Sequence, residues 1–286
     1  MNKKLRTGIL AGILLAAAAL MMGFSPASER RDKAVRLENL TWPEAEKALK
    51  GCDVVLFAVG ARSKEHGPHL PLKTDYIMAE YLADRVGREV PVAILPTLEY
   101  GYYPSFLEYP GSVSIGAETF KNTIVDICRS MSGYGVRRSY VLNTGISTLH
   151  ALKAASEELE KEGLLMRYLN LLETDKLLPP GLLRQEGGTH ADEGETSMML
   201  YIAPELVDMS KAAKDYDPRP DRKGLTRDPK GTGTYSPTGV WGDPTLATKD
   251  KGRVIVETTV AEIVRQVREL VHSPGRASTR VDALGP

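Results

Sequence analysis

The chain has 286 residues, of which 42% are hydrophobic, and 37 Lys and Arg residues balance 37 Asp and Glu residues. With no net charge, it lacks the basic field that draws proteins to nucleic acid, so nucleic acid is not an expected partner. The length suits one large domain or two small ones, and the composition allows a sizeable core.

The N-terminus has the pattern of an export signal. Three basic residues precede an apolar run at 8–22, and small residues at 25–27 form a cleavage site. The run is shorter than the roughly 20 residues that span a bilayer. We therefore predict a signal peptide at 1–27, cleaved after Ala27, rather than an uncleaved anchor. The mature protein, 28–286, is then a single periplasmic or secreted domain without a stable membrane anchor.

Short apolar runs alternate with helical patterns along the rest of the chain. Runs of strand length lie at 54–60, 92–96, 139–142 and 165–172. Apolar residues at helical spacing predict helices at 76–86, 118–131, 150–161, 191–202 and 257–271. Strands separated by helices predict an α/β fold whose mostly parallel sheet is covered on both faces.

Parallel sheets of this kind bind ligands at the carboxyl ends of their strands. That rule selects the loops after Gly60, Pro96 and Leu142. A further stretch at 211–244 is rich in Pro, Gly, Asp and Lys and has no periodicity. So long a loop in a compact domain is usually functional or disordered. The two cysteines show no sign of meeting, and we interpret them as buried thiols rather than a disulfide.

The densest polar cluster, KEHGPHLPLKTD at 64–75, directly follows the first apolar run and holds two of the five histidines. Imidazole and carboxylate groups on a stiffened loop are what a catalytic zinc or manganese site requires. His66 and Asp75 could converge from opposite ends of this turn. A surface loop whose histidines form local hydrogen bonds is the alternative, and the residue pattern alone leaves both interpretations open.

This cluster resembles the signature loop of the creatininase family, Glu-Gln-His-Gly-Pro-His-Leu-Pro-Leu-x-Thr-Asp. Further family-like segments follow in the same order: PTLEYG at 96–101, YPGSVSI at 109–115, THADEGETS at 189–197 and GDPTLAT at 242–248. The resemblance implies a three-layer α/β/α sandwich with a mostly parallel central sheet, often assembled as a hexamer. It also implies hydrolysis of a carbon–nitrogen bond in a cyclic or linear amide, with two divalent ions that share one aspartate.

Three of the ligands that the resemblance implies are missing here. His66 matches the histidine of the second metal site, and Asp75 matches the shared aspartate. The first-site glutamate falls on Lys64, the metal-binding histidine on Gly145 and the second-site glutamate on Ser147. Because an ammonium group repels a divalent ion, we predict one zinc or manganese ion per chain. We also expect Lys64 to pair with Asp75 near the vacated position, rather than to point to solvent.

His66 and Asp75 are two metal ligands, whereas the protein usually supplies at least three to a catalytic metal site. The residues that could replace the missing ligands are Glu65, His69, His190, Asp192 and Glu193, with His150 as a more remote possibility. Of these, Glu65 and Glu193 complete our predicted set with His66 and Asp75. The alternative for Glu193 is an ordinary first-turn acid, favoured by the helix dipole.

The resemblance assigns proton transfer at the substrate to His190. We add Lys64 as a catalytic candidate, because we expect its charge near the vacated metal position. Substrate contacts fall on Tyr103, Ser147 and Glu186. A tryptophan that contacts creatinine falls on Glu186, so another small amide, lactam or formamide is the expected substrate. Two functions stay open: an exported hydrolase with one ion, or an exported binding or assembly protein that has lost catalysis.

Overall fold

The computed structural model describes residues 33–218 and 224–273, and the predicted signal peptide at 1–27 lies outside them. The central sheet is parallel, with the strand order β1-β3-β2-β4-β5. Its strands are β1 (Val35–Arg36), β2 (Val55–Val59), β3 (Ala93–Ile94), β4 (Arg138–Asn143) and β5 (Leu165–Tyr168).

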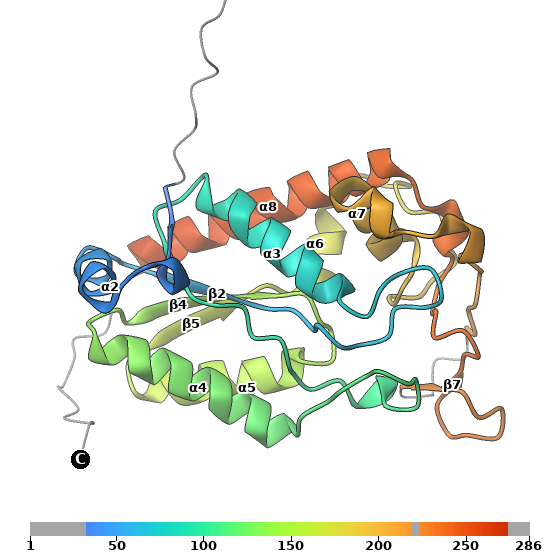
Figure 1. The fold of residues 1–286 in the computed structure, drawn as a ribbon, viewed down its shortest axis with the longest axis horizontal. Coiled ribbons are helices and arrows are strands. Elements are labelled where there is room, and N and C mark those ends of the chain that lie inside the picture. Colours follow the sequence, from blue (N-terminus) through green and yellow to red (C-terminus); the bar gives the residue numbers. More distant parts are fainter. Residues whose placement is uncertain (1–32, 219–223, 274–286) are drawn as a thin grey trace, which may run out of the picture. The chain divides into compact units, whose positions relative to one another are not determined.

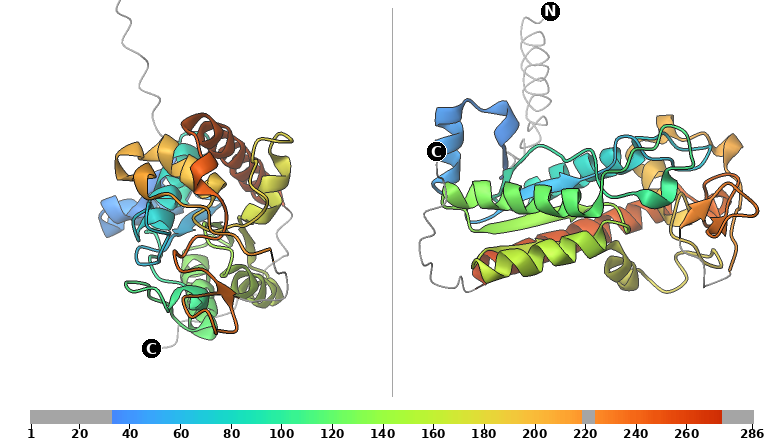
Figure 2. Two further views of the ribbon diagram at one scale, coloured as in Figure 1. Left: turned by 90° about the vertical axis from the view of Figure 1, so that its right-hand side faces the viewer. Right: turned by 90° about the horizontal axis from the view of Figure 1, so that it is seen from below.

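Helices cover both faces of this sheet (Figure 1). One face carries α3 (Thr74–Gly87), α7 (Glu193–Ile202) and α8 (Lys249–His272), and the other carries α4 (Ala117–Gly133) and α5 (Leu149–Lys161). Figure 2 shows α4 and α5 side by side beneath the sheet. The predicted three-layer α/β/α sandwich with a mostly parallel sheet is confirmed.

The two cores follow from strand geometry. Successive side chains of a strand point to opposite faces. In β2, Leu56 and Ala58 accordingly join the core under α3 and α8, whereas Phe57 and Val59 join the core under α4 and α5. All five residues of β2 are buried, which is why this strand reads as a continuous apolar run.

Several element boundaries differ from the predictions. The strand that we predicted at 165–172 is β5, which ends at Tyr168. Asn170 caps a short helix, α6 (Leu171–Thr174), where we expected the strand to continue. The last helix, α8, begins at Lys249, earlier than predicted. Its first turn is polar, so the spacing of apolar residues does not reveal it. The chain before β2 also forms α2 (Trp42–Leu49), and 211–244 contains β6 (Leu225–Thr226) and β7 (Thr234–Tyr235). No described helix is long and apolar enough to cross a membrane.

The packing of α8 on α7 yields a stability prediction. A Cβ atom on Gly252 would lie 1.8 Å from the backbone oxygen of Ser197 in α7. We expect Gly252→Ala to push the helices apart and to lower the free energy of unfolding by about 3 kcal/mol, at the upper end of overpacking effects. Gly51→Ala is the control, because its Cβ would meet nothing within 4 Å. Urea unfolding followed by circular dichroism measures both, and equal midpoints would contradict this account.

Candidate functional site

A pocket of about 260 Å³ opens where the loops that follow β2, β3 and β4 meet. These are the three loops selected by the strand-end rule, so the pocket lies where that rule places a ligand site. The start of α7 and described residues at 224–241, which include β6 and β7, close the other side. The lining residues used below are Lys64, Ser105, Phe106, Thr144, Ser147, His190, Glu195, Leu225 and Trp241.

Asp75 lies fully buried in the first turn of α3 and binds two partners. Its Oδ2 lies 2.7 Å from Lys64 Nζ, and its Oδ1 lies 2.9 Å from His66 Nε2. The expected Lys64–Asp75 pair is therefore present, and the Lys64 side chain is only 4% exposed. Burial alone would raise the pKa of Asp75, but the Lys64 and His66 charges outweigh burial and hold it well below its ordinary value.

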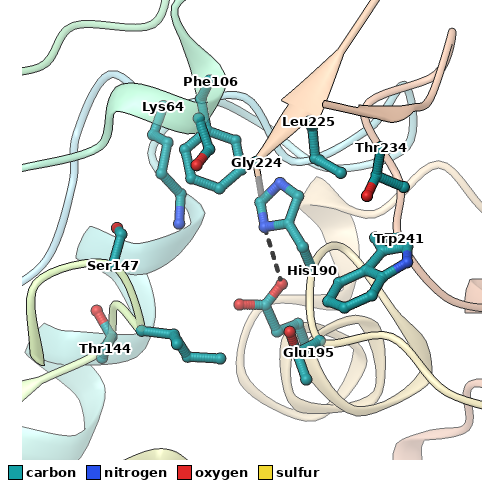
Figure 3. A pocket seen from close by; sticks show the side chains of 13 residues that line it. Lys64, Phe106, Thr144, Ser147, His190, Glu195, Gly224, Leu225, Thr234 and Trp241 are labelled. Carbon is teal, nitrogen blue, oxygen red and sulfur yellow. Dashed lines mark ion pairs between the residues drawn. The ribbon is translucent and has the colours of Figure 1, made fainter. Parts of the chain in front are cut away.

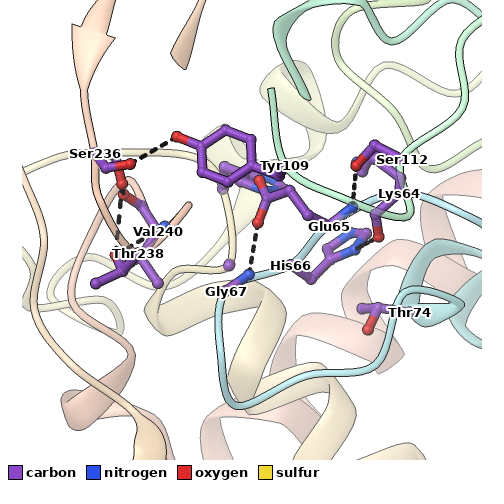
Figure 4. Close-up of polar contacts among 12 residues, drawn as sticks. Lys64, Glu65, His66, Gly67, Thr74, Tyr109, Ser112, Ser236, Thr238 and Val240 are labelled. Atoms are coloured by element: carbon purple, nitrogen blue, oxygen red, sulfur yellow. Dashed lines mark hydrogen bonds and ion pairs between the residues drawn. The ribbon is translucent and has the colours of Figure 1, made fainter. Parts of the chain in front are cut away.

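The hydrogen bonds of His66 restrict its protonation state. Nδ1 lies 3.0 Å from the backbone oxygen of Lys64 (Figure 4), which only accepts, so Nδ1 carries a proton and donates it. Nε2 faces a carboxylate oxygen of Asp75, which also only accepts. Two acceptors repel unless a cation lies between them. His66 is therefore either an imidazolium with a second proton on Nε2, or a neutral ring whose Nε2 binds a metal ion.

His190 is held in place by its backbone and by Glu65. Its backbone pairs with Trp241 in both directions, at 2.9 and 3.3 Å. Its Nε2 lies 2.7 Å from Glu65 Oε1, and Glu65 Oε2 accepts a hydrogen bond from Gly67 N at 2.8 Å. Burial would raise the pKa of Glu65, but His190, the Gly67 N–H group and His66 together outweigh burial and lower it. Because the Glu65 carboxylate holds Nε2–H, Nδ1 of His190 is the nitrogen left for a proton or a metal ion.

Glu195 is a functional candidate that the sequence reasoning missed. Its Oε2 accepts a hydrogen bond from Ala191 N at 2.5 Å and lies 3.8 Å from His190 Nδ1 (Figure 3). Burial raises the pKa of Glu195 to about 7, although the nearby His190 acts to lower it. The Asp-x-x-Glu spacing from Asp192 to Glu195 could have identified it. This is a capping pattern in which the acid reaches back over the start of the helix.

The cluster of His66, His190 and Glu195 fits one divalent ion. One ligand atom from each residue lies within 4.8 Å of the other two. Two imidazoles and one carboxylate are a donor set of catalytic zinc sites, which keep a further position open for water or substrate. The ring nitrogen that does not face the ion donates to an oxygen in both histidines: His66 Nδ1 to the Lys64 backbone and His190 Nε2 to Glu65. Metal-binding histidines are generally held in this way. Asp75 lies beside this cluster. The ammonium group of Lys64, which pairs with Asp75, disfavours a second divalent ion there.

Tyr103, which we expected to contact substrate, is buried behind Lys64 with 1% of its surface exposed. A Cβ atom on Gly101 would lie 2.8 Å from the Tyr103 hydroxyl, and a Cβ atom on Gly145 would lie 3.2 Å from its ring. Lys64 Nζ sits over the rings of Tyr103 and Phe106, 5.4 and 4.8 Å from their centroids. Glycine at 145 thus leaves room for Tyr103, and a Cβ atom there would press on its ring.

The structure does not bring Glu193 or Glu186 into the site. The Glu193 carboxylate accepts hydrogen bonds from two backbone N–H groups at 184–185 and pairs with Lys251. It therefore fastens the start of α7 to the preceding loop and to α8. The Glu186 side chain is 70% exposed and pairs with Lys214 at 3.1 Å.

Three further residues that could have replaced the missing ligands are also engaged elsewhere or exposed. His69 Nε2 lies 2.8 Å from Thr196 Oγ1, and burial above all lowers the pKa of His69 to about 4. Asp192 caps α7 by accepting a hydrogen bond from Glu195 N. His150 is exposed in the first turn of α5. Of the residues expected to bind substrate, Ser147 does line the pocket.

Comparison with known proteins gives consistent matches over most of the chain. The family model for creatinine amidohydrolase, named Creatininase, matches residues 38–267. A creatinine amidohydrolase of Pseudomonas putida is 27% identical over 257 residues, which cover 83% of this chain and 97% of that protein. A mycofactocin precursor peptide peptidase of Mycobacterium tuberculosis is 30% identical over 228 residues, covering 74% of this chain and 84% of that protein.

Solved structures show the same likeness. A mutant creatininase described as the Zn–Zn type superimposes with a TM-score of 0.69 at 25% identity, covering 82% of this chain and 98% of that one. A creatininase described with Mn superimposes with a TM-score of 0.68 at the same identity and coverage.

Proposed function

The chain belongs to the creatinine amidohydrolase (creatininase) family, and we propose that it hydrolyses a carbon–nitrogen bond of a small amide, lactam or formamide with one divalent ion per chain. The observation that carries the proposal is the cluster of two imidazoles and one carboxylate beside the pocket. Two relatives support it, since their names describe an amidohydrolase and a peptidase, which both hydrolyse carbon–nitrogen bonds. Creatinine is not the substrate that we propose, because exposed Glu186 replaces a creatinine-contacting residue.

The residues of the chain prepare this site for hydrolysis, in which water adds across the bond and the leaving nitrogen takes a proton. A zinc or manganese ion held by His66, His190 and Glu195 would polarise the substrate carbonyl and lower the pKa of bound water. The Lys64 backbone oxygen and the Glu65 carboxylate fix the tautomers of the two histidines. Proton transfer by His190, expected from the resemblance, would use the same Nδ1, and we assign that atom to the ion.

Lys64 replaces a second ion in this proposal. Its ammonium group supplies one fixed positive charge on Asp75, in a position where the resemblance implies a metal. A fixed charge of this kind stabilises developing negative charge without a second metal site to fill.

A protein that binds a small molecule without cleaving it is the second candidate. The observation that favours it is that both oxygens of Asp75 are already engaged, one by Lys64 and one by His66. Only His66 and Asp75 remain of the ligands that the resemblance implies.

An activity assay separates the two candidates. We expect the zinc- or manganese-loaded protein to release amine or acid from a panel of small amides, lactams and formamides. A chelator should abolish this release, and added metal should restore it. A folded, metal-loaded protein that cleaves none of the panel would contradict hydrolysis and favour the binding protein.

We also propose that the protein acts in the periplasm or outside the cell, as a homo-oligomer. The export proposal rests on the residue pattern at 1–27, and the oligomer on the family resemblance alone.

A further inference from the structure

The walls of the pocket differ in chemical character. His190 and Glu195 lie on one side, and Lys64 and Ser147 lie across the open space from Glu195 (Figure 3). Lys64 is the one Lys or Arg among the described lining residues. The pocket is therefore polarised, with a cationic side and a side that carries a carboxylate.

The ammonium group of Lys64 has unused hydrogen-bonding capacity. It carries three N–H donors, and among the described residues Asp75 is its one acceptor. The aromatic rings beneath it accept no ordinary hydrogen bond. Because the side chain is almost wholly buried, the remaining donors depend on whatever enters the pocket.

Ser147 offers a further donor on the same side. Its hydroxyl has no hydrogen-bond partner in the part of the chain that the structure describes. Thr144, its neighbour on this wall, already donates its hydroxyl to backbone oxygens at 59 and 75. Lys64 and Ser147 are thus the donors available to a ligand on this side.

We propose that Lys64 and Ser147 form a subsite for a carboxylate group of the substrate. The subsite rests on the proposed function and narrows its substrate class to small amides that carry a carboxylate, such as N-acyl amino acids. His190 and Glu195 are assigned to the ion, so the side of the pocket with Lys64 and Ser147 is the side left for a carboxylate. The side chains of Phe106, Leu225 and Trp241 form an apolar wall for the acyl group.

Tryptophan fluorescence provides a binding assay that needs no catalysis. The chain has two tryptophans, and Trp42 is 79% exposed on α2, so Trp42→Phe leaves Trp241 as the reporter in the pocket. The probes are N-benzoylglycine and its neutral amide, N-benzoylglycinamide. In Trp42→Phe protein as purified, we expect the acid to bind at least about tenfold more tightly than the amide, as a charge-assisted hydrogen bond implies.

Two variants test the assignment in the same background. Ser147→Ala should weaken binding of the acid about tenfold, whereas Ser105→Ala, which removes a hydroxyl elsewhere on the wall, should change nothing. The double variant Lys64→Met/Asp75→Asn removes both charges together and should abolish the preference for the acid. Equal binding of acid and amide, or no binding of the acid, would overturn the subsite.

Failure of the subsite and failure of the proposed function give different results. A protein that binds the acid but cleaves no amide refutes hydrolysis and leaves the subsite intact. Cleavage of neutral amides with no preference for the acid refutes the subsite and leaves hydrolysis intact.

Discussion

Glu195→Gln is expected to lower kcat/KM of the metal-loaded protein for its amide substrate by more than about 100-fold. Loss of groups that merely orient metal ligands costs about 10–100-fold in metal affinity or activity, so loss of a ligand should cost more. Glutamine keeps the shape of the side chain and a carbonyl oxygen that can still accept from Ala191 N. It removes the negative charge beside His190. Steady-state kinetics at saturating metal measure the effect.

Glu186→Gln is the matched control for this prediction. It makes the same chemical change on an exposed side chain that pairs with Lys214 away from the cluster. We expect kcat/KM within about twofold of the unmodified protein, since exposed ion pairs contribute little. If both variants kept full activity, Glu195 would have no part in catalysis.

Lys64→Met is expected to destabilise the protein by about 3–5 kcal/mol, because it removes one partner of a buried ion pair and leaves the other uncompensated. Asp75 has no exposed surface and would keep only His66 as a charged partner. Removing both charges in Lys64→Met/Asp75→Asn should cost less than Lys64→Met alone. Denaturant unfolding of Lys64→Met, Asp75→Asn, the double variant and the unmodified protein gives the coupling between the residues.

A surface lysine supplies the control for this stability effect. Lys153 lies on α5, is 70% exposed and pairs with Glu157 one turn later. Lys153→Met should change the free energy of unfolding by no more than about 0.5 kcal/mol. A cost below about 1 kcal/mol for Lys64→Met would show that the pair is not energetically important.

The layers of the fold and the site loop could be predicted because their signals are local. An apolar run buried on both faces identified β2, and apolar residues at helical spacing identified α4. The strand-end rule then located the loop that holds Lys64 and His66. The family resemblance, which puts Lys64 at a vacated metal position beside Asp75, predicted the pairing of these two residues.

The remaining parts of the site depend on contacts between distant segments. Glu65 lies next to His66 in the sequence but bonds His190, 125 residues away. Glu193 and Glu195 both lie in the first turn of α7, and only the direction of each side chain decides that Glu195 joins the histidines. The spacing of residues in the sequence does not give the direction of a side chain. That direction depends on the residues that each side chain contacts in the folded protein.

The central claim is that His66, His190 and Glu195 together bind one divalent ion. Elemental analysis of the purified protein after incubation with zinc or manganese and removal of excess metal tests it most directly. We predict one ion per chain in the unmodified protein and in Glu186→Gln, and none in Glu195→Gln. Two ions per chain, no ion in the unmodified protein, or one ion retained by Glu195→Gln would contradict the claim.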